Sequence, residues 1–313
     1  MDIRPYHSAD LSRVVALWND AARECFGFFP LTEKIFHDHV LAAPFFQPHR
    51  LLLAWQEEAL VGMIHFDVVE VAPYPRAGVV AAIMTRSDRR RQGIGKALLQ
   101  TALAPMRNDG ATFFAALGCW PYSSFYAGLI DGSERSGIDR RNAAAQNLFA
   151  SAGFTRGRRS LIMRGALSRA PDDKVEIAAD FYREKYPEAG QWLDVATRHW
   201  TPSRQILLDA AGHGLSYATY ARMDGYAEFC GKEIYAVYAV RTPAICRRRG
   251  YARRNLLALQ RHLAALGGEM IEVHVYADND AGIKLYQSLG FATVGESESW
   301  QLKLPAREGN YAE

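Results

Sequence analysis

The chain has 313 residues, of which 49% are hydrophobic and 23% charged, close to the average of globular proteins and enough for about two domains. Its 37 basic and 34 acidic residues leave a net charge of +3, which argues against a nucleic-acid partner. The four cysteines are scattered, no H-E-x-x-H pattern occurs, and no apolar run approaches the roughly 18–20 residues of a membrane span. Because the first residues also lack a secretory leader pattern, we expect a cytoplasmic protein without metal or membrane contact.

The N-terminal part of the chain predicts a strand, then helices, then a pair of strands. Apolar residues recur at helical spacing over Leu11–Cys25 and again over Glu33–Leu41. The apolar runs 51–55 and 60–71 follow, and QEEA between them is typical of a hairpin turn.

A strand, a glycine-spaced loop and a helix come next, and the same order returns in the second half of the chain. The two strands are GVVAAIM at 78–84 and EIYAVYAV at 233–240, and the loops with their helices begin RRQGIGKALL at 90–99 and RRRGYARRNLL at 247–257. Each helix ends at glycine, Gly110 in the first copy and Gly267 in the second. The chain therefore reads as an internal repeat.

The repeat continues through a further strand and a second helix. The strands are ATFFAALGCW at 111–120 and MIEVHVYA at 270–277. Asn142 and Asn279 then begin helices as N-caps, and twelve positions later each copy reaches a Gly-Phe pair at Phe154 and Phe291. The first copy is longer by about 20 residues, which lie in the Gly/Ser-rich segment 121–141 and predict a loop insertion.

The start of the second copy carries a weaker pattern. It predicts a helix across 178–200 and strands over 205–210 and 215–223. SRAPDD at 168–173 combines proline with a charge run and is the expected linker. We therefore expect two tandem α/β domains, 1–168 with the insertion and 174–313, each a mixed sheet flanked by helices.

The repeated loop has the features of an anion site. Glycines let the backbone approach a ligand, the N–H groups of a helix N-terminus point outward, and the helix dipole favours negative charge. Arg90 and Arg247 add a cation beside each loop. Neither a Walker pattern nor a complete dinucleotide fingerprint is present.

Two signatures in order, found twice, resemble those of the GNAT superfamily of acetyl-CoA-dependent N-acyltransferases. The pyrophosphate signature [QR]-x-x-G-x-[GA] is matched by RRQGIG from Arg90 and by RRRGYA from Arg247. The late signature, an Asn-started helix ending in L-Y-x-x-x-G-F, is matched from Asn279 to Phe291, and in the first copy with Phe149 in place of tyrosine. The tandem arrangement is similar to that of mycothiol synthase-like double-GNAT proteins.

The resemblance implies a mixed α/β (α+β) fold in each domain, acetyl-CoA as cofactor, and a set of binding residues. The family binds the pyrophosphate on the loop amides and polarises the acyl carbonyl with a strand amide, here near Met84 or Val240. The cofactor-binding residues expected in the first domain are Met84, Arg90, Arg91, Gln92, Gly93, Ile94, Gly95, Lys96 and Asn142. Those expected in the second are Val240, Thr242, Arg247, Arg248, Arg249, Gly250, Tyr251, Ala252 and Asn279.

For catalysis, the resemblance implies that a helix tyrosine protonates the departing thiolate, and this position is Tyr286. Phe149 has no proton to give, so the second domain is the expected catalytic one. The position at which the family often carries a glutamate base holds Ala236 in the second domain. Glu233 is the expected base, with Glu272 and His274 as alternatives acting through water.

The function expected from these features is N-acetyl transfer from acetyl-CoA to the primary amine of a small molecule or peptide, by a monomer or homodimer. A non-catalytic acyl-CoA sensor is the alternative, because Phe149 and the missing strand glutamate would suit a protein that binds without turnover. The insertion, with Phe125 and Tyr126 near its start, is expected to leave the sheet and wall the acceptor pocket at the domain interface, or to be a packed surface loop.

Overall fold

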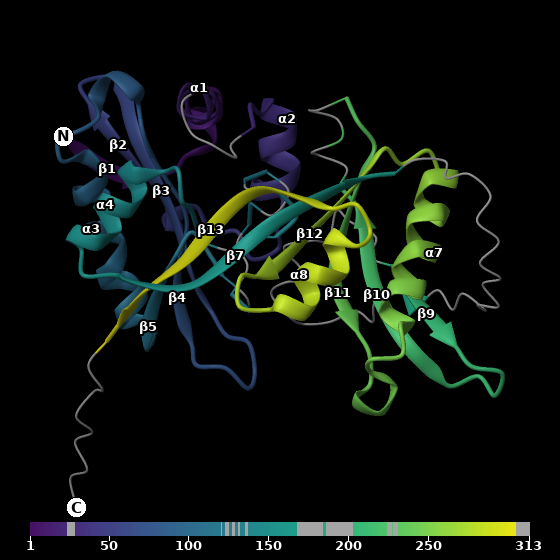
Figure 1. Cartoon of the computed structure of the whole chain (residues 1–313). Helices are drawn as coiled ribbons and strands as arrows, with labels where there is room; N and C mark the ends of the chain where they lie inside the picture. Colours follow the sequence, from purple (N-terminus) through teal and green to yellow (C-terminus); the bar gives the residue numbers. More distant parts are fainter. Residues whose placement is uncertain are drawn as a thin grey trace, which may run out of the picture.

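The computed structural model describes a single mixed sheet that runs through both halves of the chain (Figure 1). The described residues are 1–23, 29–119, 121–122, 125–126, 129–130, 132–134, 137–167, 184–185, 203–223, 227 and 231–304. The sheet has 13 strands, with the order β1-β2-β3-β4-β5-β13-β7-β12-β11-β10-β9-β8 and with β6 beside β13. In the part of the chain that is described, no helix is both long and apolar enough to cross a bilayer.

The first half contains the predicted strands and helices, and in addition a short strand, β6, inside the segment 121–141 that was predicted to be a loop. They are β1 (Asp2–Pro5), α1 (Leu11–Ala22), α2 (Glu33–Phe36) continued by a π-helical turn (His37–Leu41), β2 (Leu51–Gln56), β3 (Ala59–Val69), β4 (Ala77–Thr85), α3 (Ile94–Asn108), β5 (Phe113–Ala116), β6 (Ile138–Asp139), α4 (Ala143–Ser151) and β7 (Thr155–Ala166). The predicted hairpin is confirmed, because Gln56 pairs with Ala59 across a two-residue turn.

The second half repeats this order. Its elements are β8 (Glu184–Lys185), β9 (Ser203–Leu208), β10 (Gly214–Arg222), β11 (Ile234–Arg241), α7 (Tyr251–Ala265), β12 (Met270–Tyr276), α8 (Asp280–Gln287) and β13 (Ala292–Lys303). The helix predicted across 178–200 is wrong at residues 184–185, which pair with β9 as a strand. The rest of that range and the expected linker 168–173 lie outside the described residues.

The predicted helix caps are present in both copies. The side-chain oxygen of Asn142 accepts a hydrogen bond from the Ala145 N–H, and Asn279 caps α8 in the same way through the Gly282 N–H, each at 3.0 Å. Such a bond satisfies an N–H group that the helix itself leaves without an acceptor. These caps set where α4 and α8 begin, and hence where Phe149 and Tyr286 lie.

The two halves exchange their last strands. β13, from the end of the chain, pairs with β5 of the first half, whereas β7 of the first half pairs with β12 of the second. β7 and β13 also pair with each other and cross the centre of the molecule as its two longest strands (Figure 1). The expected mixed α/β fold is confirmed, but the two expected sheets are one sheet, because each half covers the strand edge that the other would leave open.

Helices cover both faces of the sheet in the first half. α3 and α4 bury their apolar faces with Phe149 and Phe154 on one side, in a core that also includes Trp300 of β13. α1 and α2 cover the opposite side with Trp18 and Phe36. In the second half, α7 and α8 pack on the face that corresponds to α3 and α4.

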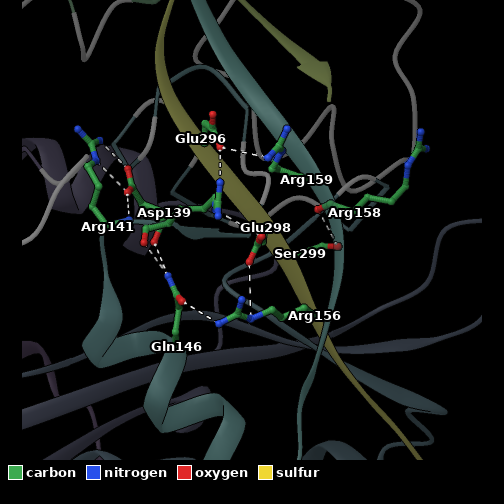
Figure 2. A network of polar contacts seen from close by, with 10 residues as sticks. Asp139, Arg141, Gln146, Arg156, Arg158, Arg159, Glu296, Glu298 and Ser299 are labelled. Carbon is green, nitrogen blue, oxygen red and sulfur yellow. Dashed lines mark hydrogen bonds and ion pairs between the residues drawn. The ribbon is translucent and has the colours of Figure 1, made fainter. Parts of the chain in front are cut away.

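A network of charged residues lies where β7 and β13 cross, beside α4 (Figure 2). Arg140 Nη1 lies 2.7 Å from Glu296, and Arg156 Nε lies 3.8 Å from Glu298. Gln146 of α4 accepts a 3.4 Å hydrogen bond from Arg156. Exposed pairs of this kind contribute about 0–1 kcal/mol each, so they help to select the strand register more than they stabilise the fold.

Candidate active site

The two glycine-spaced loops have the same backbone conformation. Arg90 and Arg247 are extended, with φ/ψ of −67°/159° and −66°/160°. Arg91 and Arg248 both have φ of 61°, and the N-cap glycines of α3 and α7 have φ of 81° and 78°. Left-handed residues between an extended segment and a helix turn backbone N–H groups toward one side, which suits a concave anion site.

Space is open in front of both loops. A Cβ built on Gly93 or on Gly250 would meet no atom within 4 Å. The first helical hydrogen bonds run from Ala97 to Gly93 and from Arg254 to Gly250, so the N–H groups of the first turn precede the intrahelical ladder. No side chain caps either N-terminus. These features fit a bound pyrophosphate, held by the backbone from Arg91 to Lys96 and from Arg248 to Ala252.

Other residues that were predicted to bind the cofactor lie in or beside these loops. Met84 and Val240 lie on β4 and β11 shortly before the loops, and Thr242 follows β11 and accepts a 3.1 Å hydrogen bond from Arg247 Nε through its backbone oxygen. Ile94 is 1% exposed and packs into the core, so that only its backbone can face a ligand. The first loop is also tied to α1, because the Ser87 N–H donates to Asp20 Oδ2 at 2.7 Å.

The sheet splits beside each loop. β4 pairs with β5 only over Ala77–Val80, and β11 pairs with β12 only over Ile234–Val237. One residue later, each strand has a bulge against its other neighbour, at Ala81 in β4 and at Tyr238 in β11. The ends of β4 and β11 therefore present backbone groups to a wedge between parallel strands, where an extended ligand could pair with them.

In the first half, the insertion fills the side of this wedge opposite α3. Phe125 and Tyr126 are at most 2% exposed and pack in one core with Ala81, Ala82 and Met84 at the end of β4. Both rings also contact His65, and Tyr126 Oη lies 2.9 Å from His65 Nδ1. Across the wedge, Phe149 is fully buried against Phe154, with ring centroids 5.0 Å apart. Packed side chains thus occupy both sides of the first wedge.

In the second half, Tyr286 occupies the position that Phe149 has in the first half. It is 7% exposed and packs on Phe291, with ring centroids 5.6 Å apart. Burial and the negative charge of Glu134 raise the pKa of Tyr286 to about 12. The phenol therefore keeps its proton throughout the neutral range and has a hydrogen to donate.

Glu272 and His274 lie on β12, on the side of the second wedge opposite Tyr286. Glu272 Oε1 accepts from the Ser133 N–H at 2.6 Å and lies 3.3 Å from His274 Nε2, while Oε2 accepts from Arg164 Nε at 2.7 Å. Burial alone would raise the pKa of Glu272, but the hydrogen bonds and charges of His274, Arg164 and Ser133 lower it to about 2. Glu272 is therefore a buried anion whose oxygens are occupied.

Glu233, the base expected from the sequence, does not join Tyr286. It precedes β11 at the end of the strand away from the loop, about seven residues or roughly 23 Å from Val240. Its carboxylate is 41% exposed and accepts two 2.6 Å hydrogen bonds from Arg222. The hydrogen bonds and charge of Arg222 lower the pKa of Glu233, against a smaller upward shift from partial burial. Glu233 is therefore a paired surface carboxylate.

A carboxylate that sequence reasoning missed is Glu134, in the insertion of the first half. Burial, and after it the charge of Glu134, raises the pKa of three tyrosines around the second wedge, which are Tyr238, Tyr276 and Tyr286. The insertion thus reaches the interface between the halves as expected, although Ile138–Asp139 return to the sheet as β6. Neither periodicity nor a motif marks Glu134 in the sequence. The one sequence feature that points to it is its position in the insertion, close to aromatic residues.

Comparison with known proteins links both halves to one kind of fold. The family described as "Acetyltransferase (GNAT) family" matches residues 12–123, and the family described as "FR47-like protein" matches residues 221–301. The chain is 28% identical over 292 residues to the mycothiol acetyltransferase of Saccharomonospora viridis, covering 88% of this chain and 89% of that protein. It is 25% identical over 267 residues to the mycothiol acetyltransferase of Mycobacteroides abscessus, covering 78% and 81%.

Solved structures with the same fold also span the whole chain. A tandem GNAT protein from the clavulanic acid biosynthesis pathway has a TM-score of 0.64 at 15% identity and covers 97% of this chain and 99% of its own. A GCN5-related N-acetyltransferase from Sphaerobacter thermophilus has a TM-score of 0.64 at 13% identity, covering 96% and 95%. The fold is therefore shared over at least 96% of this chain.

Proposed function

We propose that the chain is a tandem GNAT acetyltransferase that transfers the acetyl group of acetyl-CoA to a primary amine at the wedge of its second half. The observation that carries this assignment is the difference between two equivalent helix positions. α8 presents the hydroxyl of Tyr286, whereas α4 presents the apolar ring of Phe149. Both halves have the phosphate loop, but only the second has a proton donor at this position.

Acetyl-CoA, when bound, supplies the thioester whose acetyl group is transferred. The loop amides of Arg248–Ala252 hold its pyrophosphate, and the free edge of β11 near Val240 provides an N–H group to polarise the thioester carbonyl. Tyr286 Oη holds the proton that the departing sulfur takes up. Since a thiolate is poorly solvated in a partly dry cleft, a positioned acid lowers the barrier there.

The first half is proposed to bind acetyl-CoA without transferring it. Its loop has the same backbone as the second, but Phe125 and Tyr126 occupy the acceptor side of its wedge. The alternative function, binding of acyl-CoA without turnover as a sensor, is therefore proposed for the first half only. The acceptor amine belongs to a small molecule or peptide, and amine entry is expected only at the second wedge.

Tyr286→Phe tests the assignment. We expect kcat to fall by about 10²–10⁴-fold with nearly unchanged acetyl-CoA affinity, because one positioned acid is lost and the ring still packs on Phe291. The measurement is thiol release with acetyl-CoA and a panel of glucosamine, an amino-acid methyl ester and a tripeptide with a free N-terminus, alongside calorimetric titration of acetyl-CoA.

Tyr74→Phe is the matched control, because Tyr74 is 38% exposed and belongs to neither loop. Its kcat should equal that of the unmodified protein. Full kcat in Tyr286→Phe would place the acid elsewhere and return the first half as the catalytic candidate.

A further inference from the structure

We propose that Glu134, carried by the insertion of the first half, is the general base of the second half. This inference rests on the proposed function, since it assigns the acceptor's proton to a residue beside the same wedge. The active centre is then composite: the second half holds the acetyl donor and the acid Tyr286, and the first half supplies the base.

The tip of the insertion is clamped onto β12 immediately before Glu134. Ser133 is 2% exposed, and its N–H donates to Glu272 Oε1 at 2.6 Å. Gly132 has φ of 87°, and a Cβ there would overlap the Glu272 carboxylate. Only glycine lets the backbone approach this closely, so these two contacts fix where the Glu134 side chain begins.

Among the carboxylates considered for the base, Glu134 alone is both near the wedge and not committed to an ion pair with arginine. Glu272 is held by Arg164, and Glu233 is held by Arg222 at the far end of β11. The strand position at which related proteins often carry a glutamate holds Ala236, which is fully buried. Glu134 lies close enough to Tyr286 for its charge to act on the phenol.

Several titratable groups lie close enough to Glu134 for their charges to interact with it. They are Tyr238 of β11, His274 and Tyr276 of β12 and Tyr286 of α8. Glu272 of β12, paired with Arg164 of β7, contacts the neighbouring Ser133. Burial raises the pKa of Glu134, and the nearby charge of His274 opposes this shift in part. A carboxyl group with a raised pKa is a better proton acceptor at neutral pH than an exposed one.

The proton balance of the step is simple. The acceptor enters as an ammonium ion and gives one proton to the Glu134 carboxylate, so an N–H bond breaks and an O–H bond forms. The neutral amine then forms the C–N bond while the C–S bond breaks, and the sulfur takes the Tyr286 proton. The second proton lost by the nitrogen restores Tyr286, and Glu134 releases its proton to water.

Glu134→Gln is the direct test, with the best acceptor of the amine panel as substrate. We expect kcat to fall by about 10²–10⁴-fold and the acid limb of the pH–kcat/KM profile to disappear, because that limb reports ionisation of the base. Glu134→Asp should restore part of the rate and the limb. Glu58→Gln, on the exposed β2–β3 turn, is the matched control and should change neither.

Two further readouts separate the possible failures. The tyrosinate absorbance of Tyr286, obtained by difference against Tyr286→Phe, should titrate at lower pH in Glu134→Gln, because a nearby negative charge has been removed. Thermal melts show whether each variant is folded, and a misfolded Glu134→Gln leaves the decision to the pH profile of Glu134→Asp. An unchanged acid limb in the folded variants overturns the inference.

The same series distinguishes this inference from the proposed function. If Tyr286→Phe loses activity and Glu134→Gln keeps its rate and acid limb, only the assignment of the base is overturned. If Tyr286→Phe remains fully active, the assignment of chemistry to the second half fails first.

Discussion

His65 shows that packed side chains fill the wedge between β4 and β5 in the first half. Its side chain is fully buried between Phe125 and Phe46, and Tyr126 Oη is its hydrogen-bond partner at Nδ1. Burial, with a smaller contribution from the charge of Arg50, lowers the pKa of His65 to about 3. At neutral pH the imidazole is therefore neutral and serves as a packed polar group.

This burial predicts a pH-dependent stability. The folded pKa lies below the unfolded value near 6.5, so the unfolded chain binds the extra proton between these values, and stability present above about pH 6.5 is lost as the pH falls. We expect the free energy of unfolding to decrease by up to about 1.4 kcal/mol per pH unit from this residue. Urea titrations at about pH 7 and pH 5 measure it.

His65→Gln should flatten this slope relative to the unmodified protein, whereas His49→Gln, at an exposed position, should not. Equal slopes in all three proteins would mean that His65 is not the buried neutral group.

At the scale of elements, the repeated unit is a strand end, a left-handed turn and a helix N-terminus. The local sequence determines this unit, because a non-glycine residue with φ near 61° and a glycine N-cap recur at the same spacing in both halves. The unit presents N–H groups to an anion without requiring a charged side chain in a fixed position.

Substitutions at the N-cap glycines test this unit. We expect Gly93→Asp and Gly250→Asp each to weaken acetyl-CoA binding at its own loop, because the carboxylate would occupy the open space before the N–H groups. Gly93→Asn and Gly250→Asn should weaken it less, since asparagine has a similar shape and tolerates positive φ but carries no charge. Calorimetric titration gives the affinity and number of sites.

Gly212→Asp controls for backbone strain, because Gly212 has φ of 83° in an open turn between β9 and β10 and belongs to neither loop. Aspartate variants at both loops that bind as tightly as the unmodified protein would show that acetyl-CoA binds elsewhere.

At the scale of the whole molecule, strand exchange makes the two halves dependent on each other. The proposed domain ranges 1–168 and 174–313 do not each contain all strands of their own part of the sheet, because β13 completes the first half and β7 completes the second. Trp300 illustrates the consequence: it belongs to the second half in sequence but is 3% exposed in the core of the first, with Arg156 5.2 Å above its ring.

Trp300→Ala should therefore destabilise the first half. We expect a loss of about 3–5 kcal/mol, as for other large-to-small core substitutions, with faster amide exchange in β5 and α3. Hydrogen exchange with mass spectrometry measures the location, and denaturant titration measures the size. Val294→Ala is the matched control, because Val294 lies on the same strand but is 45% exposed. Faster exchange restricted to β12 and α8 would contradict the assignment of Trp300 to the first core.

The sequence by itself determined the features that depend on residues close together in the chain. The repeated order of elements, the Asn caps, the glycine-spaced loops and the contrast between Phe149 and Tyr286 follow from local periodicity and backbone preference. Glycine and asparagine mark these positions because few other residues adopt the required dihedrals or satisfy the helix ends.

Only the tertiary structure decided which segments meet across the molecule. The exchange of β7 and β13, the filling of the first wedge by Phe125 and Tyr126, and the position of Glu134 beside the second wedge all join residues far apart in sequence. An insertion without periodicity carries no signal for its packing partner, and an exposed strand edge can pair with any strand of suitable pattern. Glu233 shows the same limit: the sequence offers it as the nearest carboxylate on the loop strand, and the structure pairs it with Arg222 at the end of β11 away from the loop.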